Sequence, residues 1–223
     1  MKLISKGNTA EIFENGDNLV CKLFYSGYPK LYIEHELDNA KAVFQLGLKT
    51  PRAYNLICVD GRDGIVYDKV IGETLSSKMH HASEEELMVW TYRFADIHKE
   101  LLGHHIDNVM DYKGFLKMFA KDSVEVIAKI NELEDGDCLL HGDFHPANIM
   151  VDTDDQLILI DMMNVCKGPA MYDIARTYFL LEKDKRLQNR YLELMGYELK
   201  DVMPYLEVIL LIRENEMKNE FSS

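Results

Sequence analysis

A segment in the second half of the chain combines residue types that could act on a hydroxyl group. Residues 138–151 read CLLHGDFHPANIMV, so a polar loop containing Asp143 and Asn148 lies between two apolar runs. A turn at 152–155 leads into another apolar run, which Asp161 follows directly. Apolar runs around a turn pair as a hairpin, and this hairpin brings Asp161 back beside the polar loop. Two carboxylates and one amide therefore converge at one end of a buried β ribbon.

These three side chains suit phosphoryl transfer assisted by a hard metal ion. Mg²⁺ takes few protein oxygens and keeps positions open for phosphate oxygens, so Asn148 and Asp161 are candidate metal ligands. Asp143 is then free to accept a proton from an attacking hydroxyl, as the catalytic base. The spacing His141-x-Asp143-x-x-x-x-Asn148 is that of the kinase catalytic loop, and Asp161 stands where a second metal ligand is needed.

A kinase mechanism also needs a nucleotide site, and the start of the chain offers candidates for it. Residues 6–11 include small residues, Gly7 and Thr9 among them, that let backbone amides approach phosphates. The last predicted strand of this region ends in a segment with Asp68 and Val70, whose main-chain groups could bind adenine. ATP is therefore the expected cosubstrate.

Lys22, in the first part of the chain, is expected to need an anionic partner. Lys22 has apolar neighbours on both sides, so it belongs to a largely buried strand. A buried ammonium group requires an anionic partner. Phosphate supplies one, and Glu34 or Glu36 on the next predicted helix supplies another.

Strand and turn signals dominate a first lobe, which we place at residues 1–71. Asn15-Gly16 between two short runs is typical of a hairpin turn whose residues have positive φ. Gly47 ends a helix, which Pro51 prevents from continuing. The predicted elements are strands at 11–14, 19–24, 54–59 and 64–70 and a helix at 31–46. They form a small antiparallel sheet with one helix packed on it.

Helical periodicity takes over after Gly72, and we place a second, mainly helical lobe at residues 72–223. Ser83 precedes three glutamates, the arrangement that a helix N-terminus favours, and opens the first of these helices. Further helices are predicted at 113–134, 169–182, 184–196 and 203–219. The fold class is therefore α+β.

Three segments together resemble the aminoglycoside phosphotransferase and choline kinase-like family. They are HGDFHPAN at 141–148 with Ile160-Asp161, GLKTP at 47–51 and YDIAR at 172–176. The resemblance covers nearly the whole chain. It implies a bilobal protein-kinase-like fold, ATP with Mg²⁺, and transfer of the γ-phosphoryl group to a hydroxyl of a small molecule.

The same resemblance implies roles for individual residues. Asp143 would be the catalytic base, and Asn148 and Asp161 would hold the metal ions. Lys22 would bind the phosphates, and the second of the two candidate glutamates, Glu36, would orient it. Acceptors that fit the family include aminoglycoside-like compounds, choline-like amino alcohols and sugars, and the sequence does not choose among them.

The chain departs from protein kinases after Asp161. Asp161-Met162-Met163 stands in place of Asp-Phe-Gly, and no Ala-Pro-Glu follows. Without a long activation segment, protein substrates are disfavoured. A nucleotide-binding pseudokinase or regulatory module of the same fold is the alternative, although the presence of all the expected site residues argues against it.

Composition excludes several other functions. Twenty-five Lys and Arg against 38 Asp and Glu give a net charge of −13. Binding to nucleic acid or to an anionic membrane is therefore not expected, whereas a cationic acceptor would fit the sign of the charge. The four cysteines form no C-x-x-C pair and no apolar run is long enough to span a membrane, so a cytoplasmic location is expected.

Several other polar residues have structural explanations. His141 is predicted to brace its loop by hydrogen bonding, and His98, beside an apolar stripe, to be a packed core histidine. Asp173 is predicted to cap a helix or to brace the catalytic loop. His104 and His105 follow a helix and are predicted to be surface or capping residues.

Overall fold

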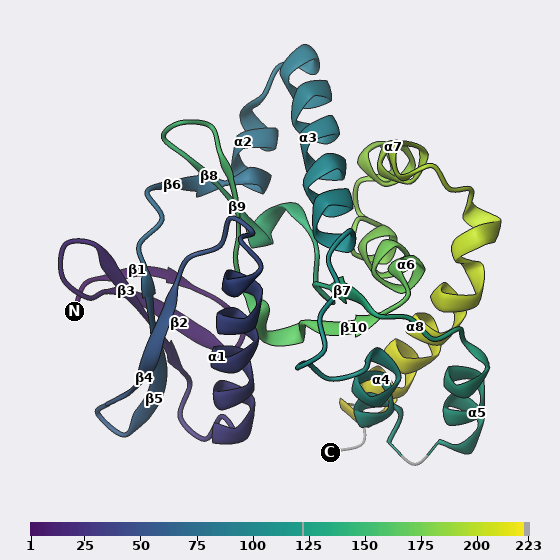
Figure 1. Ribbon diagram of the computed structural model, residues 1–223, viewed down its shortest axis with the longest axis horizontal. Coiled ribbons are helices and arrows are strands. Elements are labelled where there is room, and N and C mark those ends of the chain that lie inside the picture. Colours follow the sequence, from purple (N-terminus) through teal and green to yellow (C-terminus); the bar gives the residue numbers. More distant parts are fainter. Residues whose placement is uncertain (122, 221–223) are drawn as a thin grey trace. The chain divides into compact units, whose positions relative to one another are not determined.

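The chain divides into two units (Figure 1). The computed structural model describes the backbone of residues 1–121 and 123–220, without the side chains of 215–220. Unit 1 consists of Met1–His80 with Ala147–Asn164, and unit 2 of His81–Pro146 with Val165–Ser223. Among the described helices, none combines the length and the apolar character that crossing a bilayer requires.

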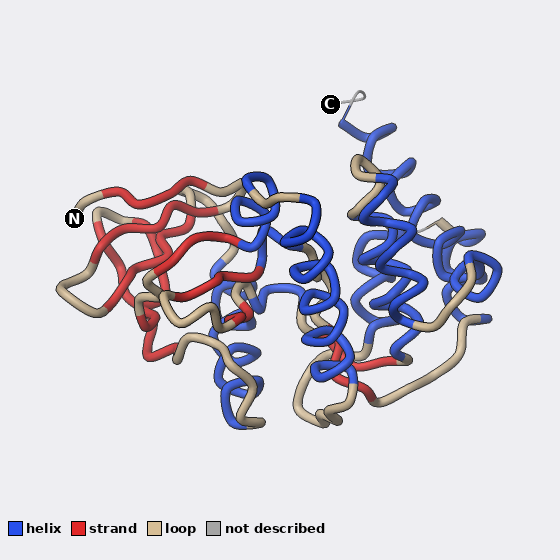
Figure 2. The backbone as a smooth tube through the Cα atoms, turned by 90° about the horizontal axis from the view of Figure 1, so that it is seen from above, coloured by secondary structure: helices blue, strands red, loops and turns tan. Residues whose placement is uncertain are grey.

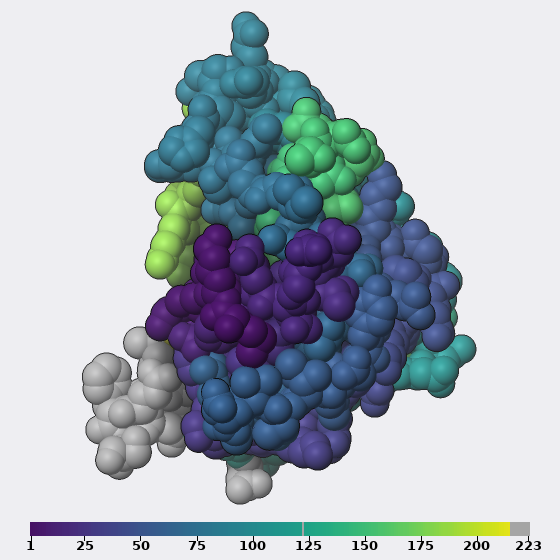
Figure 3. Space-filling view, turned by 90° about the vertical axis from the view of Figure 1, so that its left-hand side faces the viewer, coloured from purple at the N-terminus to yellow at the C-terminus, as the bar shows by residue number. Residues whose placement is uncertain are grey.

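A five-stranded antiparallel sheet forms the first part of unit 1 (Figure 2). Its strands are β1 (Leu3–Lys6), β2 (Ala10–Glu14), β3 (Leu19–Phe24), β4 (Ala53–Val59) and β5 (Arg62–Asp68), in the order β1-β2-β3-β5-β4. The last four correspond to the predicted strands. The first is an additional edge strand that was not predicted, exposed along its length and visible at the surface in Figure 3 (purple).

Two of the hairpin turns of this sheet, between β2 and β3 and between β4 and β5, differ from each other. The Asn15 N–H donates to the Leu19 carbonyl over 3.0 Å and closes a longer loop, in which Gly16 alone has positive φ, +82°. The hairpin is confirmed, but the expected Asn-Gly turn with two positive φ angles is wrong. Asp60 and Gly61 have φ of 51° and 76° and form that tighter kind of turn between β4 and β5.

Helix α1 (Lys30–Gln45) packs against β4 and β5. Its buried residues are Ile33, Glu36, Leu37, Asn39, Ala40 and Val43. Glu34 is exposed, because two residues turn the helix by roughly 200° and place Glu34 and Glu36 on opposite faces. Gly47 has φ +81° just beyond the helix, as expected of a residue that ends it.

A smaller antiparallel sheet and a second helix complete unit 1. Its elements are β6 (Gly72–Thr74), α2 (Leu75–His81), β8 (Ile149–Asp152) and β9 (Leu157–Leu159), with the strand order β6-β8-β9. The β8–β9 hairpin was predicted, whereas β6 and α2 were not. Because β8 pairs with β6, and the Leu159 N–H donates to the Lys49 carbonyl over 2.8 Å, residues 147–164 join unit 1. The observed units therefore differ from the predicted division between residues 71 and 72.

Helices and one small sheet form the described part of unit 2. They are α3 (Glu84–Leu102), α4 (Tyr112–Ala120), α5 (Val124–Glu132), β7 (Cys138–Leu140), β10 (Cys166–Gly168), α6 (Ala170–Leu180), α7 (Lys185–Met195) and α8 (Leu199–Glu220). Ser83 caps α3 as predicted. Its side chain accepts from the Glu86 N–H, and the Glu86 side chain accepts from the Ser83 N–H.

The prediction of a single helix over 113–134 is wrong, because the structure has two helices there. Lys121, with φ +44°, ends α4, and α5 begins at Val124. Both helices bury apolar residues, such as Leu116 in α4 and Ile130 in α5. The apolar spacing continues across the break, so periodicity alone did not reveal it.

Candidate active site

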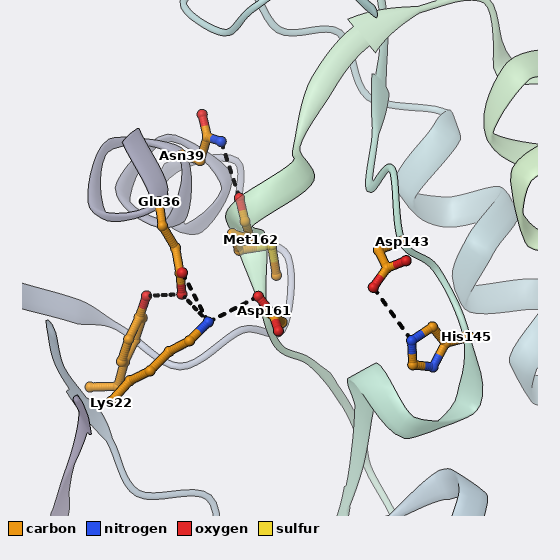
Figure 4. A network of polar contacts seen from close by, with 8 residues as sticks. Lys22, Glu36, Asn39, Asp143, His145, Asp161 and Met162 are labelled. Carbon is orange, nitrogen blue, oxygen red and sulfur yellow. Dashed lines mark hydrogen bonds and ion pairs between the residues drawn. The ribbon is translucent and has the colours of Figure 1, made fainter. Parts of the chain in front are cut away.

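A buried ion pair in unit 1 joins β3 to α1. The Lys22 Nζ lies 2.7 Å and 2.9 Å from the two carboxylate oxygens of Glu36, which is 1% exposed (Figure 4). The Tyr67 hydroxyl on β5 donates to Glu36 Oε1 over 2.8 Å. The structure thus pairs Lys22 with Glu36, the glutamate on the buried face of α1, and not with exposed Glu34.

Electrostatics keep the Lys22 ammonium charged. Burial opposes the charged form, but the carboxylates of Glu36 and Asp161 outweigh it, so the pKa of Lys22 is raised. Burial, together with the Glu36 carboxylate, raises the pKa of Tyr67 well above its ordinary value. Tyr67 therefore stays a hydrogen-bond donor to Glu36 across the physiological pH range.

Asp161 lies at the other side of Lys22. Its Oδ1 is 3.0 Å from the Lys22 Nζ, and its side chain is 40% exposed (Figure 4). Its φ of +64° is uncommon for a residue with a side chain and costs backbone energy. Neighbouring contacts hold this conformation: the Asn39 amide donates to the Met162 carbonyl over 3.1 Å, and the Ile160 N–H donates to the Asn148 carbonyl over 3.0 Å.

The structure brings Asn148 and Asp161 together within unit 1. The hydrogen bond from Ile160 to Asn148 places the two candidate metal ligands at one end of the β8–β9 hairpin. They offer one amide oxygen and one carboxylate, which is the donor chemistry that Mg²⁺ accepts. Asn148 is half-buried and the Asp161 carboxylate is partly exposed, so the residues fit a metal ion that also keeps outside ligands.

Asn39 supports the candidate site and was not predicted from the sequence. It is buried, and its hydrogen bond to Met162 connects α1 to the segment just after Asp161. Its position three residues after Glu36 places it on the same face of the helix. A polar residue at that spacing on an apolar face was the available signal.

Gly7 and Thr9, which are predicted to contact the phosphates, lie in the loop between β1 and β2, where their backbone groups form hydrogen bonds. The Gly7 N–H donates to the Ala10 carbonyl over 2.8 Å, and the Thr9 carbonyl accepts from the Tyr25 N–H over 3.0 Å. These contacts shape the loop between β1 and β2. They leave the role of Gly7 and Thr9 in phosphate binding a prediction.

Asp68 and Val70 lie at the end of β5 and just after it. The Asp68 N–H donates to the Arg52 carbonyl over 3.0 Å, and the Asp68 carboxylate accepts from the Tyr54 hydroxyl over 2.7 Å. Val70 is half-buried. Their contact with adenine stays a prediction. It concerns their main-chain groups, because the Asp68 carboxylate already accepts from Tyr54.

Asp143 belongs to unit 2, in the loop after β7. Its Oδ2 is 3.5 Å from His145 Nε2 (Figure 4). Its Oδ1 is 3.7 Å from Arg176 Nη2, and its side chain is 28% exposed. Burial favours the neutral acid, but the hydrogen bond with His145 and the charges of His145 and Arg176 outweigh it. The pKa of Asp143 is therefore lowered, and the group is a carboxylate near neutral pH.

A buried carboxylate holds the backbone of the candidate catalytic loop, which carries Asp143. Asp173 on α6, which is 0% exposed, accepts from the His141 N–H over 2.7 Å and from the Gly142 N–H over 2.9 Å. Gly142 has φ +74°, which a residue with a side chain rarely adopts. The predicted bracing role of Asp173 is confirmed, and the loop conformation places Asp143 directly after this glycine.

His98 supports Asp173 from the core. Its Nε2 is 3.1 Å from Asp173 Oδ2, its Nδ1 is 2.7 Å from the Tyr191 hydroxyl, and its ring stacks on Phe144 at 3.8 Å between centroids. Burial outweighs the carboxylate and lowers the pKa of His98, so the ring is neutral. A neutral ring satisfies both contacts when Nε2–H donates to Asp173 and Nδ1 accepts from Tyr191. The predicted packed core histidine is thus confirmed.

Comparison with known proteins supports the family resemblance. The model of the phosphotransferase enzyme family matches residues 116–205, which include Asp143, Asn148 and Asp161. None of the curated proteins matches the sequence at a significant level. The predicted family is therefore supported over residues 116–205, which contain the candidate residues of the second half of the chain.

Solved structures of aminoglycoside phosphotransferases resemble the whole chain. The aminoglycoside-3'-phosphotransferase of type VIII has a TM-score of 0.70 at 16% identity, with 96% of this chain and 93% of that chain covered. APH(3'')-Id from Streptomyces rimosus, in complex with ADP and streptomycin, has a TM-score of 0.67 at 15% identity, over 91% of this chain and 90% of that chain. APH(4)-Ia has a TM-score of 0.69 at 14% identity, over 99% and 88%. The predicted α+β protein-kinase-like fold is confirmed.

Proposed function

We propose that this protein transfers the γ-phosphoryl group of ATP to a hydroxyl of a small molecule, with Mg²⁺. The match of residues 116–205 to the phosphotransferase enzyme family and the protein-kinase-like fold support this proposal. The observation that carries the proposal is the buried Lys22–Glu36 pair with Asp161 at 3.0 Å from Lys22, in a chain whose catalytic segment matches the family. Charged groups are buried at such cost only where their charge is used or fully paired.

Unit 1 supplies the groups for the nucleotide and the metal. The Lys22 ammonium has three N–H donors, and two bonds to Glu36 and one to Asp161 use all of them. An incoming phosphate must therefore replace one of these bonds. The bond to Asp161 is the longest and the most exposed, so it is the one that we expect a phosphate to replace while Glu36 continues to hold Lys22. The Asp161 carboxylate would then be available to hold a metal ion.

ATP with Mg²⁺ supplies the phosphoryl group and neutralises its developing charge. Asn148 and Asp161 are the residues that would hold the metal. Gly7 and Thr9 would contact the phosphates, and main-chain groups at Asp68 and Val70 would contact the adenine.

Unit 2 supplies the acceptor for the substrate proton. Because the pKa of Asp143 is lowered, it is a weak base, and its first role is to orient the acceptor hydroxyl by accepting its hydrogen bond. It takes the proton late, as the bond to phosphorus forms, which suits the loose transition state of phosphoryl transfer. His145 and Arg176 hold the carboxylate in position.

A small molecule is the proposed acceptor. Structurally similar kinases have been solved with streptomycin and with hygromycin B. For this chain the candidates are aminoglycoside-like compounds, choline-like amino alcohols and sugars, and the net charge of −13 favours a cationic one. The four cysteines are free thiols, which fits the predicted cytoplasmic location.

The first experiment is calorimetric titration of ATP into the protein with and without Mg²⁺, followed by turnover assays on a panel of alcohols. We expect Mg²⁺-dependent binding that Asp161→Ala weakens. Asp143→Asn is expected to keep the ATP affinity and to lower turnover by about 10²- to 10⁴-fold. Asp154→Asn, in the exposed β8–β9 turn, is the control and should change neither.

Three outcomes would contradict the proposal. Absence of ATP binding under both conditions would exclude the kinase mechanism and favour a scaffold of the same fold. ATP binding with equal turnover in the wild type and in Asp143→Asn would remove Asp143 from the mechanism, and binding without turnover on any acceptor would favour a pseudokinase.

A further inference from the structure

A cluster of metal-binding side chains lies in unit 2, outside the groups proposed for phosphoryl transfer. His105 belongs to the loop after α3. Asp137 directly precedes β7, and Cys138 is the first residue of that strand. An antiparallel bridge pairs His105 with Cys138, and the Leu139 N–H donates to the His104 carbonyl over 2.7 Å. Backbone hydrogen bonding therefore holds the two segments in register.

The donor atoms are close enough to share one ion. One ligand atom from each of His105, Asp137 and Cys138 lies within 4.8 Å of the other two, and His105 Nδ1 is 3.1 Å from Asp137 Oδ1. Tetrahedral zinc, with ligands at about 2.0–2.3 Å, needs donors roughly 3.3–3.8 Å apart. Small side-chain rotations would bring these donors to that spacing, because His105 and Asp137 are exposed.

We propose that His105, Asp137 and Cys138 form a binding site for one thiophilic divalent transition metal ion such as Zn²⁺, with solvent as the fourth ligand. An imidazole, a carboxylate and a thiolate are ligands that Zn²⁺ accepts together. The thiolate discriminates against Mg²⁺, which prefers oxygen ligands. On binding, the Cys138 thiol gives its proton to solvent and no redox change occurs. This site does not depend on the proposed kinase activity.

The position of the site gives it a structural consequence. Strand β7 covers residues 138–140 and continues directly into the loop that carries Asp143. A metal ion on Cys138 and His105 would cross-link the beginning of this strand to the loop after α3. Because the folded chain presents the three ligands together and an unfolded chain does not, binding is expected to raise the thermal unfolding midpoint.

Co²⁺ is the probe for the site, because a cobalt–thiolate bond has a charge-transfer absorption that oxygen ligands do not produce. The full-length, reduced protein is titrated with Co²⁺ in excess Mg²⁺, and the Co²⁺ is then displaced with Zn²⁺. We expect one equivalent of Co²⁺ with thiolate absorption, displaced by one equivalent of Zn²⁺. Each metal should raise the thermal midpoint.

Three variants and a control identify the ligands. Cys138→Ser should abolish the thiolate absorption, and His105→Ala and Asp137→Asn should weaken binding by about tenfold or more. Cys58→Ser removes the exposed thiol of unit 1 and should leave the titration unchanged. His105 is exposed, so its variant is expected to fold, which circular dichroism checks.

The proposal would be overturned by any of three results. The first is a Co²⁺ titration that produces no cobalt–thiolate absorption band. The second is equal Co²⁺ affinity in the wild type and in His105→Ala. The third is loss of the thiolate band in Cys58→Ser instead of in Cys138→Ser.

Discussion

Glu36 in unit 1 and Asp173 in unit 2 are both buried carboxylates, but their partners differ in kind. Glu36 faces a full positive charge on Lys22, together with the Tyr67 hydroxyl. Asp173 accepts from two backbone N–H groups of the catalytic loop and from the neutral ring of His98. One carboxylate therefore holds a functional side chain, and the other holds the backbone that presents a functional side chain.

This difference explains how each unit positions its chemistry. Lys22 is a long, flexible side chain, so a charged partner is needed to hold its ammonium in place. Asp143 has a short side chain, so its position follows from the backbone of residues 141–143, which Asp173 holds. Loss of Glu36 should therefore disturb nucleotide binding, whereas loss of Asp173 should disturb turnover.

The largest expected effect comes from breaking the ion pair of unit 1. Lys22→Met leaves the Glu36 carboxylate buried with a hydrogen bond from the Tyr67 hydroxyl but without the Lys22 ammonium, and we expect a loss of about 3–5 kcal/mol in unfolding free energy. Adding Glu36→Gln removes the unpaired charge, keeps an acceptor for Tyr67 and should restore most of the loss. Urea unfolding measures both, and ATP titration should show no recovery of binding in the double variant.

Lys30→Met is the matched control within α1. Lys30 and Glu34 form an exposed pair at 3.8 Å, so the substitution should change stability little. Equal losses for Lys30→Met and Lys22→Met would contradict the view that burial makes the Lys22 pair important.

The second prediction concerns the brace of unit 2. Asp173→Asn replaces charge-assisted hydrogen bonds to the His141 and Gly142 amides with weaker ones, and we expect a loss of about 1.5–3 kcal/mol. Turnover should fall while ATP affinity stays unchanged, because the substitution acts on the loop of Asp143.

Asp184→Asn, at the N-terminal cap of α7, is the control for this substitution. Asn caps a helix as well as Asp does, so neither stability nor turnover should change. A fall in ATP affinity for Asp173→Asn that equals its fall in turnover would contradict a role confined to the catalytic loop.

The third prediction is a pH dependence of stability that belongs to His98. Its pKa in the folded protein lies below its ordinary value of 6.5, so the unfolded chain binds the proton first as the pH falls. Stability should therefore decline below about pH 6.5, by at most about 1.4 kcal/mol per pH unit for this group. His98→Gln keeps a donor toward Asp173 without titrating, so the stability of this variant should fall less as the pH drops below about 6.5.

The smallest effect is expected on the acidic side of the pH profile of kcat/KM, the acid limb, where activity falls as Asp143 becomes protonated. His145→Ala removes a partner that lowers the pKa of Asp143, and burial then acts with less opposition, so the limb should move to higher pH. Arg176→Lys keeps the positive charge near Asp143 and should move it less. A pH profile of kcat/KM for each variant measures the shift, and an unchanged limb in His145→Ala would show that another group sets it.

Much of this molecule could be predicted from local pattern. The spacing of Asp143, Asn148 and Asp161 and the apolar strand around Lys22 lie within short stretches of chain, and the predicted strands and most helices follow the same rule. The break between α4 and α5 was not predicted because the apolar spacing continues through it. Strand β6 and helix α2 were not predicted because they are short.

The choice between Glu34 and Glu36 shows what local pattern leaves open. Both glutamates follow Lys22 at similar spacing, and the family resemblance alone favoured Glu36. In the structure Glu36 lies on the face of α1 that is buried, and Glu34 is exposed on the other face. Which face is buried depends on how the helix packs on β4 and β5.

Periodicity and motif spacing were enough for most of the elements and for the choice of the candidate site residues, because both are properties of neighbouring residues. Tertiary contacts between distant segments decided the rest. They join 147–164 to unit 1, place the Asp173 carboxylate on the amides of the catalytic loop, and bring His105 beside Cys138. Each of these depends on hydrogen bonds between groups more than 30 residues apart, and such pairings exist only once the chain has folded.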